Sequence, residues 1–275
     1  MTTKLLKTLT TRHGTMLAFP NDQFLTRCLE VYGEFSPNEA GMLEQIARPG
    51  MTIVEVGANI GAHTVAIARA CQPGTVYAFE PQRRVFQVLC ANLALNDIEN
   101  VVALQQACGA EAGEVVVPPL NYRAPGNFGG ISMLPPTSVG ERVPLVRLDD
   151  LRLPACGLIK VDVEGFEAEV LKGATDTIAR TRPLLYVEND RPEKQRELIS
   201  LIAALGYRLY WHTPGLISRD NFNGATHNVF NLNYKSINML CLPNESPMQT
   251  DMEPIDPADP RAPAELNPDR PPVGG

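Results

Sequence analysis

Strand-like and helix-like segments alternate along most of this chain, and this alternation constrains its fold more than any other feature. Between Met51 and Leu242, short apolar and β-branched runs are followed by segments whose apolar residues recur at helical spacing. Such alternation is typical of a mostly parallel sheet with helices on both faces. We therefore expect one α/β domain over residues 51–242, with an antiparallel pair of strands at its end.

The regions on either side of this domain have different patterns. Residues 1–50 contain two helix-like segments, Asp22–Tyr32 and Pro37–Ala47, which we expect to form a helical cap on the sheet. Nine of the 33 residues from Pro243 to Gly275 are proline, and this segment has no apolar period. Such a composition cannot bury enough surface to offset the entropy of ordering. Residues 243–275 are therefore predicted to be a disordered, acidic tail.

Charge and hydropathy exclude several classes of partner. The net charge is −7, and the tail with seven acids and two bases contributes −5 of it. The remainder is close to neutral, which argues against a nucleic-acid partner, because phosphate binding needs a basic face. No apolar run is long enough for a membrane span, and the N-terminus has no secretory signal pattern. We therefore expect a cytoplasmic protein whose six cysteines are free, buried thiols.

A glycine turn joins the first strand of the domain to its first helix. The segment Glu55-Val-Gly57-Ala-Asn59-Ile-Gly61 stands where a ligand-cradling turn belongs in such folds. Gly57 would allow a positive φ, and Gly61 would let the helix approach the strand. Thr64 follows in the first turn of that helix. We interpret these residues as part of a nucleotide-like cofactor site.

A carboxylate at the end of the second strand extends this site. Glu80 lies nineteen residues after Gly61 and could accept hydrogen bonds from both hydroxyls of a ribose. Asn59 replaces the glycine that lets a backbone approach a pyrophosphate, and Glu55 would repel phosphate but attract a sulfonium group. These features favour S-adenosylmethionine over a nicotinamide cofactor, so a nicotinamide-dependent oxidoreductase is the alternative.

Acidic and amide side chains close the next two strands. Asp162 ends one buried strand, and Glu188 and Asn189 end the following one. If the two strands are neighbours, these oxygens converge, and such a set suits Mg²⁺. A bound cation would hold two substrate hydroxyls and lower the pKa of one of them. Glu164, two residues after Asp162, is then a candidate general base.

Several other polar residues have simpler interpretations. Asp190 before Arg191-Pro192 is typical of a helix cap. Glu167 and Glu169 fit a solvated helix face, and His63 fits local packing after the glycine turn. His212 and His227 remain weaker candidates for the base. Core packing explains the aromatic residues near the end of the domain better than stacking on a sugar does; these residues are Tyr210, Trp211 and Phe222.

Four segments in this order resemble the FkbM-type methyltransferases over roughly Glu30 to Pro243. They are Val54–Gly61, Phe79-Glu80-Pro81, Arg147-Leu-Asp149-Asp150-Leu151 and Ile159–Glu167. The resemblance implies a class I, Rossmann-like fold, with a seven-stranded sheet whose last strand is antiparallel. It also implies methyl transfer from S-adenosylmethionine, usually to an oxygen of a sugar or a polyketide-like product.

A more distant similarity bears on the metal. Sugar O-methyltransferases of antibiotic pathways place a metal-binding acid after the fourth strand and two acids after the fifth. Asp162 and Glu188 match those positions, whereas Asn189 stands where that pattern has an acid. We expect an O-methyltransferase for a sugar, glycan or secondary-metabolite acceptor, with a protein acceptor as an alternative. The segments Pro118–Gly140 and His212–Asn228 are predicted to line the acceptor pocket.

Overall fold

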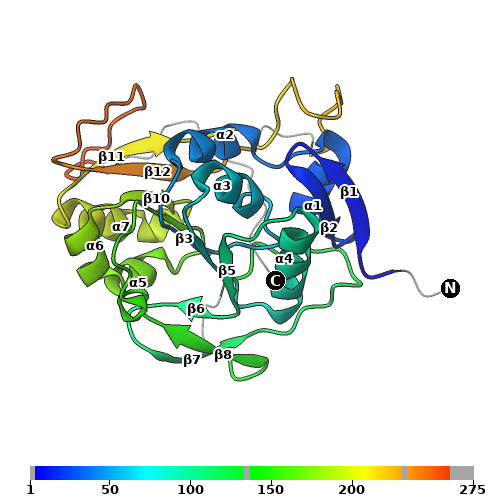
Figure 1. Ribbon diagram of the computed structural model, residues 1–275, viewed down its shortest axis with the longest axis horizontal. Coiled ribbons are helices and arrows are strands. Elements are labelled where there is room, and N and C mark those ends of the chain that lie inside the picture. The colour runs from blue at the N-terminus through cyan, green and yellow to red at the C-terminus, as the bar shows by residue number, and fades with distance from the viewer. Residues whose placement is uncertain (1–3, 133–136, 231–233, 261–275) are drawn as a thin grey trace.

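Seven strands form the central sheet of the structure, a computed structural model that describes residues 4–132, 137–230 and 234–260. Their order is β11-β12-β10-β9-β3-β4-β5, and only β12 among these seven runs against its neighbours (Figure 1). This is the mostly parallel sheet with an antiparallel last strand that we predicted. The strands are β3 (Ile53–Val56), β4 (Val76–Phe79), β5 (Val101–Leu104), β9 (Leu158–Val161), β10 (Leu184–Glu188), β11 (Tyr207–His212) and β12 (Asn238–Pro243).

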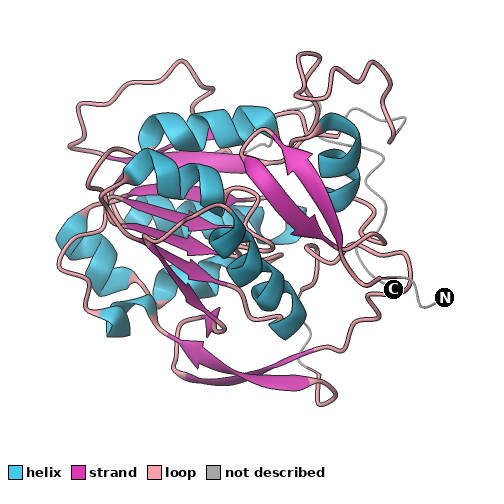
Figure 2. Cartoon of the chain, turned by 45° about the vertical axis from the view of Figure 1, so that its right-hand side comes forward, coloured by secondary structure: helices cyan, strands magenta, loops and turns pink. Residues whose placement is uncertain are grey.

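Helices cover both faces of this sheet (Figure 2). Side chains of alternate strand residues divide the core into two clusters, with Ile53 in one and Val54 in the other. The Ile53 side is covered by the N-terminal elements and by α3 (Thr64–Cys71) and α4 (Arg83–Leu95). The Val54 side is covered by α5 (Glu167–Lys172), α6 (Thr175–Thr181) and α7 (Pro192–Ala204).

The N-terminal cap contains both expected helices and a hairpin that we did not predict. The helices are α1 (Leu25–Tyr32) and α2 (Pro37–Ile46), and the hairpin pairs β1 (Lys7–Thr11) with β2 (Gly14–Ala18). The Asn92 side chain of α4 bonds both backbone groups of Leu17 in this hairpin, at 2.6 and 3.0 Å. The cap is therefore fixed to the domain by specific polar contacts as well as by apolar packing.

A small three-stranded sheet lies beside the main one. It consists of β6 (Ala107–Cys108), β7 (Gly113–Val117) and β8 (Glu141–Val146), in which β8 pairs with both of the others. A 3-10 turn (Leu148–Leu151) follows β8. There the Asp149 carboxylate accepts hydrogen bonds from the backbone N–H groups of Asp176 and Thr177, at the start of α6. Asp149 thus caps a helix, which assigns this part of the motif a structural role.

The segment after β12 differs from the prediction of a disordered tail. Residues 244–260, here called the C-terminal strap, pass along the outer edge of β11. The N–H of Trp211 donates to Glu253, and the N–H of Ile255 donates to Leu209, both at 2.8 Å. The Ile255 side chain is buried in the core. Backbone pairing orders this stretch together with three apolar side chains, Ile255, Met248 and Met252, and composition alone does not reveal this. Residues 261–275 lie outside the described part of the chain.

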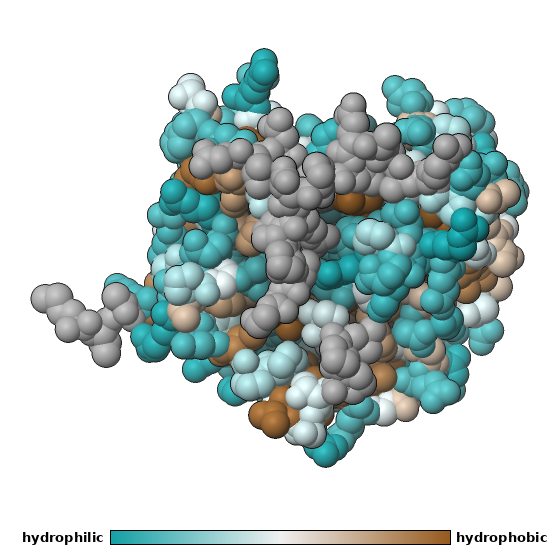
Figure 3. Space-filling model, turned by 180° about the vertical axis from the view of Figure 1, so that it is seen from behind, coloured by the Kyte–Doolittle hydropathy of each residue, from teal (hydrophilic) through white to brown (hydrophobic). Residues whose placement is uncertain are grey.

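The described residues on the face shown in Figure 3 are mainly hydrophilic, with hydrophobic residues between polar ones. Four large apolar side chains are exposed, and each comes from a different segment: Leu95, Val102, Val139 and Phe222. Within the described residues, every helix is too short or too polar to cross a membrane.

Candidate active site

A cavity of about 630 Å³ opens at the carboxyl ends of β3, β4, β9 and β10. The strand order changes direction between β3 and β9, because β4 follows on one side and β10 on the other. In open α/β sheets, ligands bind at such a switch point. Three segments form the walls: the N-terminal cap, the loop 117–131, and the chain around Leu216 and Tyr234–Asn238.

The glycine turn after β3 has the conformation that its sequence predicts. Gly57, Asn59 and Gly61 have φ angles of 90°, 50° and 88°. A Cβ atom on Gly57 would lie 1.9 Å from the carbonyl oxygen of Asp162, and one on Gly61 would lie 2.8 Å from Leu89 Cδ1. Both glycines therefore serve close packing as well as the left-handed backbone. Asn59 adopts that conformation without being glycine, and its side chain bonds the following N–H of Ile60.

Glu80 connects the end of β4 to this turn. Its carboxylate accepts hydrogen bonds from the N–H of Asn59 at 3.0 Å and from the N–H of Gln82 at 2.9 Å. Burial raises the pKa of Glu80 to about 7, although these two hydrogen bonds act in the opposite direction. An ionised carboxylate has about four acceptor positions. Two of them remain for a ligand in the cavity.

A row of buried charges lies beneath the turn. Glu55 of β3 is paired in register with Lys160 of β9, so the two side chains lie on the same face. The ammonium of Lys160 is 3.9 Å from Glu55 and 3.3 Å from Asp162, and Thr64 donates to the other oxygen of Glu55 at 2.7 Å. Burial alone would lower the pKa of Lys160, but Asp162 and Glu55 raise it above its ordinary value.

Lys160 is a site residue that the sequence analysis missed. It is almost completely buried, with 2% of its surface exposed, and it lines the cavity. The signal was present, because a lysine inside an apolar strand is costly unless charges of opposite sign surround it. The sequence analysis considers the acids Glu55 and Asp162 but not the lysine that lies between them.

The turn after β9 holds Glu164 over the cavity. Glu164 has a φ of 55°, and Gly165 beside it has a φ of 96°. The Glu167 carboxylate accepts hydrogen bonds from the N–H groups of Gly165 (2.9 Å) and Val163 (3.3 Å), so it fixes this turn. Glu167 is buried and does not lie on a solvated helix face as we expected. The reason is that the helix begins only at Glu167, whose side chain turns back over the loop.

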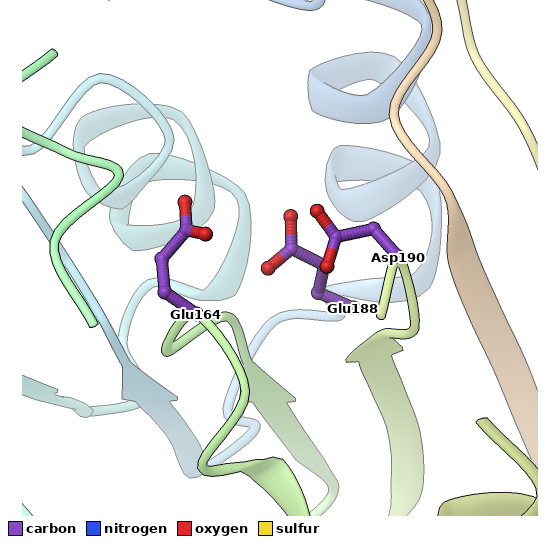
Figure 4. A group of neighbouring side chains, drawn as sticks. All are labelled: Glu164, Glu188 and Asp190. Carbon is purple, nitrogen blue, oxygen red and sulfur yellow. The ribbon is translucent and has the colours of Figure 1, made fainter. Parts of the chain in front are cut away.

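Three carboxylates come together beside this turn. Glu164, Glu188 and Asp190 each present an oxygen within 4.8 Å of the other two (Figure 4). Arg191 forms a close ion pair with Glu164, and its Nε atom lies 3.4 Å from Asp190. The guanidinium of Arg191 therefore already balances part of the negative charge of these three carboxylates.

The set predicted for a metal is not the set that the fold brings together. Asp162 is hydrogen-bonded to Lys160, and Asn189 turns away from the cavity to place its amide 3.2 Å from the sulfur of Met239. Of the three predicted ligands, Glu188 belongs to the cluster of three carboxylates described above. In that cluster Asp190 takes the place that we expected for Asn189. Consecutive residues after a strand point in different directions, so the residue after Glu188 faces the core. Asp190, expected to be a helix cap, lines the cavity, and the N-cap residue of α7 is Arg191.

The other candidate residues occupy varied positions. His212 receives or donates a 2.9 Å hydrogen bond with the hydroxyl of Tyr186, and His63 lines the cavity. Trp211 is buried in the core, whereas Phe222 is exposed. Within the segments predicted to line the acceptor pocket, the described cavity lining includes residues 120–131 in part and, from the later segment, Leu216.

Comparison with known proteins identifies the family. A family model described as the methyltransferase FkbM domain matches residues 55–209, which is more than half of the chain. The chain belongs to the FkbM methyltransferase family. The matched residues include the glycine turn, Glu80, Lys160 and the acidic turn, and they leave out the N-terminal cap.

Three characterised relatives show how far this likeness extends. Methyltransferase sdnD of Sordaria araneosa is 34% identical over 166 residues, which are 45% of this chain and 60% of that protein. The 31-O-demethyl-FK506 methyltransferase FkbM of Streptomyces tacrolimicus is 30% identical over 193 residues, 58% of this chain and 74% of that protein. The hexuronic acid methyltransferase AglP of Haloferax volcanii is 30% identical over 127 residues, 45% of this chain and 50% of that protein. The chain therefore spans about 60% of the length of the first relative.

Proposed function

We propose that this protein is an S-adenosylmethionine-dependent O-methyltransferase that acts on a hydroxyl of a sugar, glycan or secondary-metabolite acceptor. The observation that carries the proposal is the charge of the cavity. Among the described residues that line it, seven are acids and two are lysines. Such a surface suits a sulfonium and an ammonium group and disfavours a pyrophosphate. The acids are Glu39, Glu55, Glu80, Asp162, Glu164, Glu188 and Asp190.

The cofactor would lie along the carboxyl ends of β3 and β4. In this proposal Glu80 accepts the ribose hydroxyls with the acceptor positions that Asn59 and Gln82 leave open. Glu55, which Thr64 and Lys160 hold in place, supplies negative charge near the turn. Gly57, Asn59 and Gly61 set the path of the backbone against which the cofactor packs. The family membership and the acidic lining support this placement.

The acceptor would lie over β9 and β10. When bound, S-adenosylmethionine would supply an electrophilic methyl carbon to the acceptor oxygen, and its sulfur would leave as the neutral thioether of S-adenosylhomocysteine. Glu164 is proposed to take the proton of that hydroxyl as the new C–O bond forms. The ion pair of Glu164 with Arg191 stabilises the ionised carboxylate, which can accept a proton. The nearby carboxylates of Glu188 and Asp190 act in the opposite direction, because they disfavour a further negative charge on Glu164. Asp162 fixes Lys160 beneath the reacting atoms. Alignment of the two reactants supplies most of the acceleration.

This mechanism uses Arg191 where our earlier hypothesis used Mg²⁺. Asn189 is hydrogen-bonded to Met239 and Asp162 to Lys160, and the three carboxylates that lie together already have an arginine beside them. We therefore expect turnover to continue in the presence of EDTA. Loss of turnover in EDTA that added Mg²⁺ restores would return the metal to the mechanism.

Calorimetric titration tests the cofactor. We expect S-adenosylhomocysteine to bind with micromolar affinity and NADPH to show no binding. Glu111→Gln is a suitable control, because Glu111 is exposed and does not line the cavity. Binding of NADPH without binding of S-adenosylhomocysteine would overturn the proposal in favour of a nicotinamide-dependent oxidoreductase.

Methyl transfer from tritium-labelled S-adenosylmethionine tests the acceptor. The probes are neutral glycosides, hexuronic acid glycosides, a hydroxylated macrolide and a cell protein extract. The names of the relatives, one for a hexuronic acid and one for a 31-O-demethyl product, support a small hydroxylated acceptor. Label recovered in the protein fraction alone would replace this acceptor class by a protein.

A further inference from the structure

Glu39 is a buried carboxylate in the cavity wall that neither the motifs nor the family match assigns to any role. It lies in α2 of the N-terminal cap, outside the matched residues 55–209. Only 3% of its surface is exposed, and yet it lines the cavity. A carboxylate buried to this degree is costly unless something pairs with it.

Ser36 holds this carboxylate in place. The Ser36 hydroxyl donates to one oxygen of Glu39 (Oε2) at 3.0 Å. Ser36 itself has a φ of 43°, which is a left-handed conformation for a residue that is not glycine, and its side chain is fully buried. Such a backbone costs on the order of 1–3 kcal/mol, and strain of this kind clusters at binding sites. The strained residue is thus the one that bonds Glu39.

The second oxygen of Glu39 has no hydrogen bond of normal length among the described residues. It lies 3.8 Å from Nδ1 of His63, and the other ring nitrogen of His63 also lacks a hydrogen-bond partner. Both residues line the cavity, and both are more than nine-tenths buried. Burial raises the pKa of Glu39 to about 7 and lowers the pKa of His63 to about 4. The second oxygen of Glu39 is thus a buried hydrogen-bond acceptor that is left for a ligand in the cavity, with His63 beside it.

The local charge is also out of balance. Lys160 is a cation that acts on Glu39, and Asp162 and Glu55 already lie 3.3 and 3.9 Å from its ammonium. Glu39 adds a third carboxylate for one ammonium. S-adenosylmethionine carries two positive groups, of which the α-ammonium has three N–H donors and the sulfonium has none. An open carboxylate oxygen beside a histidine matches the group that donates hydrogen bonds.

We propose that Glu39, oriented by Ser36, binds the α-ammonium group of the methionine portion of the cofactor. This inference rests on the proposed function. It makes the N-terminal cap part of the cofactor site, which the family domain alone would leave incomplete. The cap would then close over the cofactor through a charged contact and not only through shape.

The test is a crossed titration of ligands against variants. The probes are S-adenosylhomocysteine, its analogue without the amino group and its analogue without the carboxyl group. For Glu39→Gln, which keeps the Ser36 bond, we expect at least tenfold weaker binding of S-adenosylhomocysteine and of the decarboxylated analogue. Binding of the deaminated analogue should change less than twofold. Glu111→Gln is the matched control and should bind all three as the wild type does.

Each outcome assigns the failure to one claim. If the wild type binds no S-adenosylhomocysteine, the proposed function fails. If the wild type binds it and Glu39→Gln weakens all three ligands equally, Glu39 acts through structure and the inference fails alone. Unchanged binding in Glu39→Gln also overturns it. A second variant, Ser36→Gly, relieves the strained backbone while removing the hydroxyl, so it should fold and still bind S-adenosylhomocysteine several-fold more weakly.

Discussion

The two halves of the cavity are built in different ways. In the cofactor half, Glu80 is held by backbone N–H groups, and the glycine turn is held by close contact with β9 and α4. In the acceptor half, Glu164 is placed by side chains, namely the carboxylate of Glu167 and the guanidinium of Arg191. Groups fixed by the backbone are coupled to folding, whereas groups fixed by long side chains can change without unfolding the chain. We therefore expect variants of the first half to alter stability and cofactor affinity together, and variants of the second to alter turnover alone.

The largest expected effect is on turnover and comes from replacing Glu164, in the acceptor half of the cavity. Glu164→Gln keeps the size of the side chain but removes the proton acceptor, so turnover should fall about 10²- to 10⁴-fold. Affinity for S-adenosylhomocysteine should stay within twofold. The measurement is single-turnover methyl transfer beside calorimetry, on an acceptor that the wild type methylates. A variant with full turnover would show that another group takes the proton.

Gly57 tests the coupling of the cofactor half to folding. A Cβ on Gly57 would meet the carbonyl oxygen of Asp162 at 1.9 Å, and the φ of 90° is strained for alanine. Gly57→Ala should lower the free energy of unfolding by about 3 kcal/mol or more. Gly41→Ala is the matched control, because a Cβ there meets nothing within 4 Å; in α2 it should stabilise by about 0.5–1 kcal/mol. The measurement is the free energy of unfolding of both variants in denaturant. Equal stabilities of Gly57→Ala and Gly41→Ala would contradict the prediction.

The pH dependence of stability tests whether Glu80 is buried as tightly as its contacts imply. Burial raises the pKa of Glu80 from its ordinary 4.5 to about 7, so the folded state holds a proton that the unfolded state has lost. The contribution of Glu80 to stability therefore falls as pH rises from about 4.5 to 7. Since Gln cannot ionise, the stability of the wild type relative to Glu80→Gln should fall by up to about 3 kcal/mol between pH 5 and 8. Subtracting the variant removes the opposite contribution of His63, whose pKa burial lowers to about 4. A constant difference across this range would contradict the prediction.

The smallest expected effect concerns cofactor affinity. Glu80→Gln keeps one oxygen as an acceptor and loses the charge, so S-adenosylhomocysteine should bind about tenfold more weakly at pH 8. At pH 5.5 the wild-type carboxyl is itself protonated, and the difference between the two proteins should shrink. Equal affinities at pH 8 would remove Glu80 from the cofactor site.

The same contrast explains what the sequence could predict. The strand–turn–helix around Gly57 is local, so its residues and its conformation could be predicted directly. The alternation of elements predicted a mostly parallel sheet, and the family resemblance implied seven strands with the last one antiparallel. The acceptor half depends on contacts between residues far apart in sequence, such as Glu164 with Arg191. Whether Asn189 or Asp190 faces the cavity depends on the path of a turn that no periodicity reports. Glu39 belongs to a helix whose packing against α3 and whose place in the cavity wall become apparent only in three dimensions.

The C-terminal strap has a consequence for how this protein behaves in concentrated solution. β11 is the outermost strand of the sheet, and the strap occupies backbone groups of Leu209 and Trp211 that would otherwise face outward. An open strand edge is a template on which a second molecule can add its own strand. The strap thus protects against self-association as well as packing on the core. A domain boundary placed at residue 243 on the basis of composition would remove the strap and leave the edge of β11 unpaired.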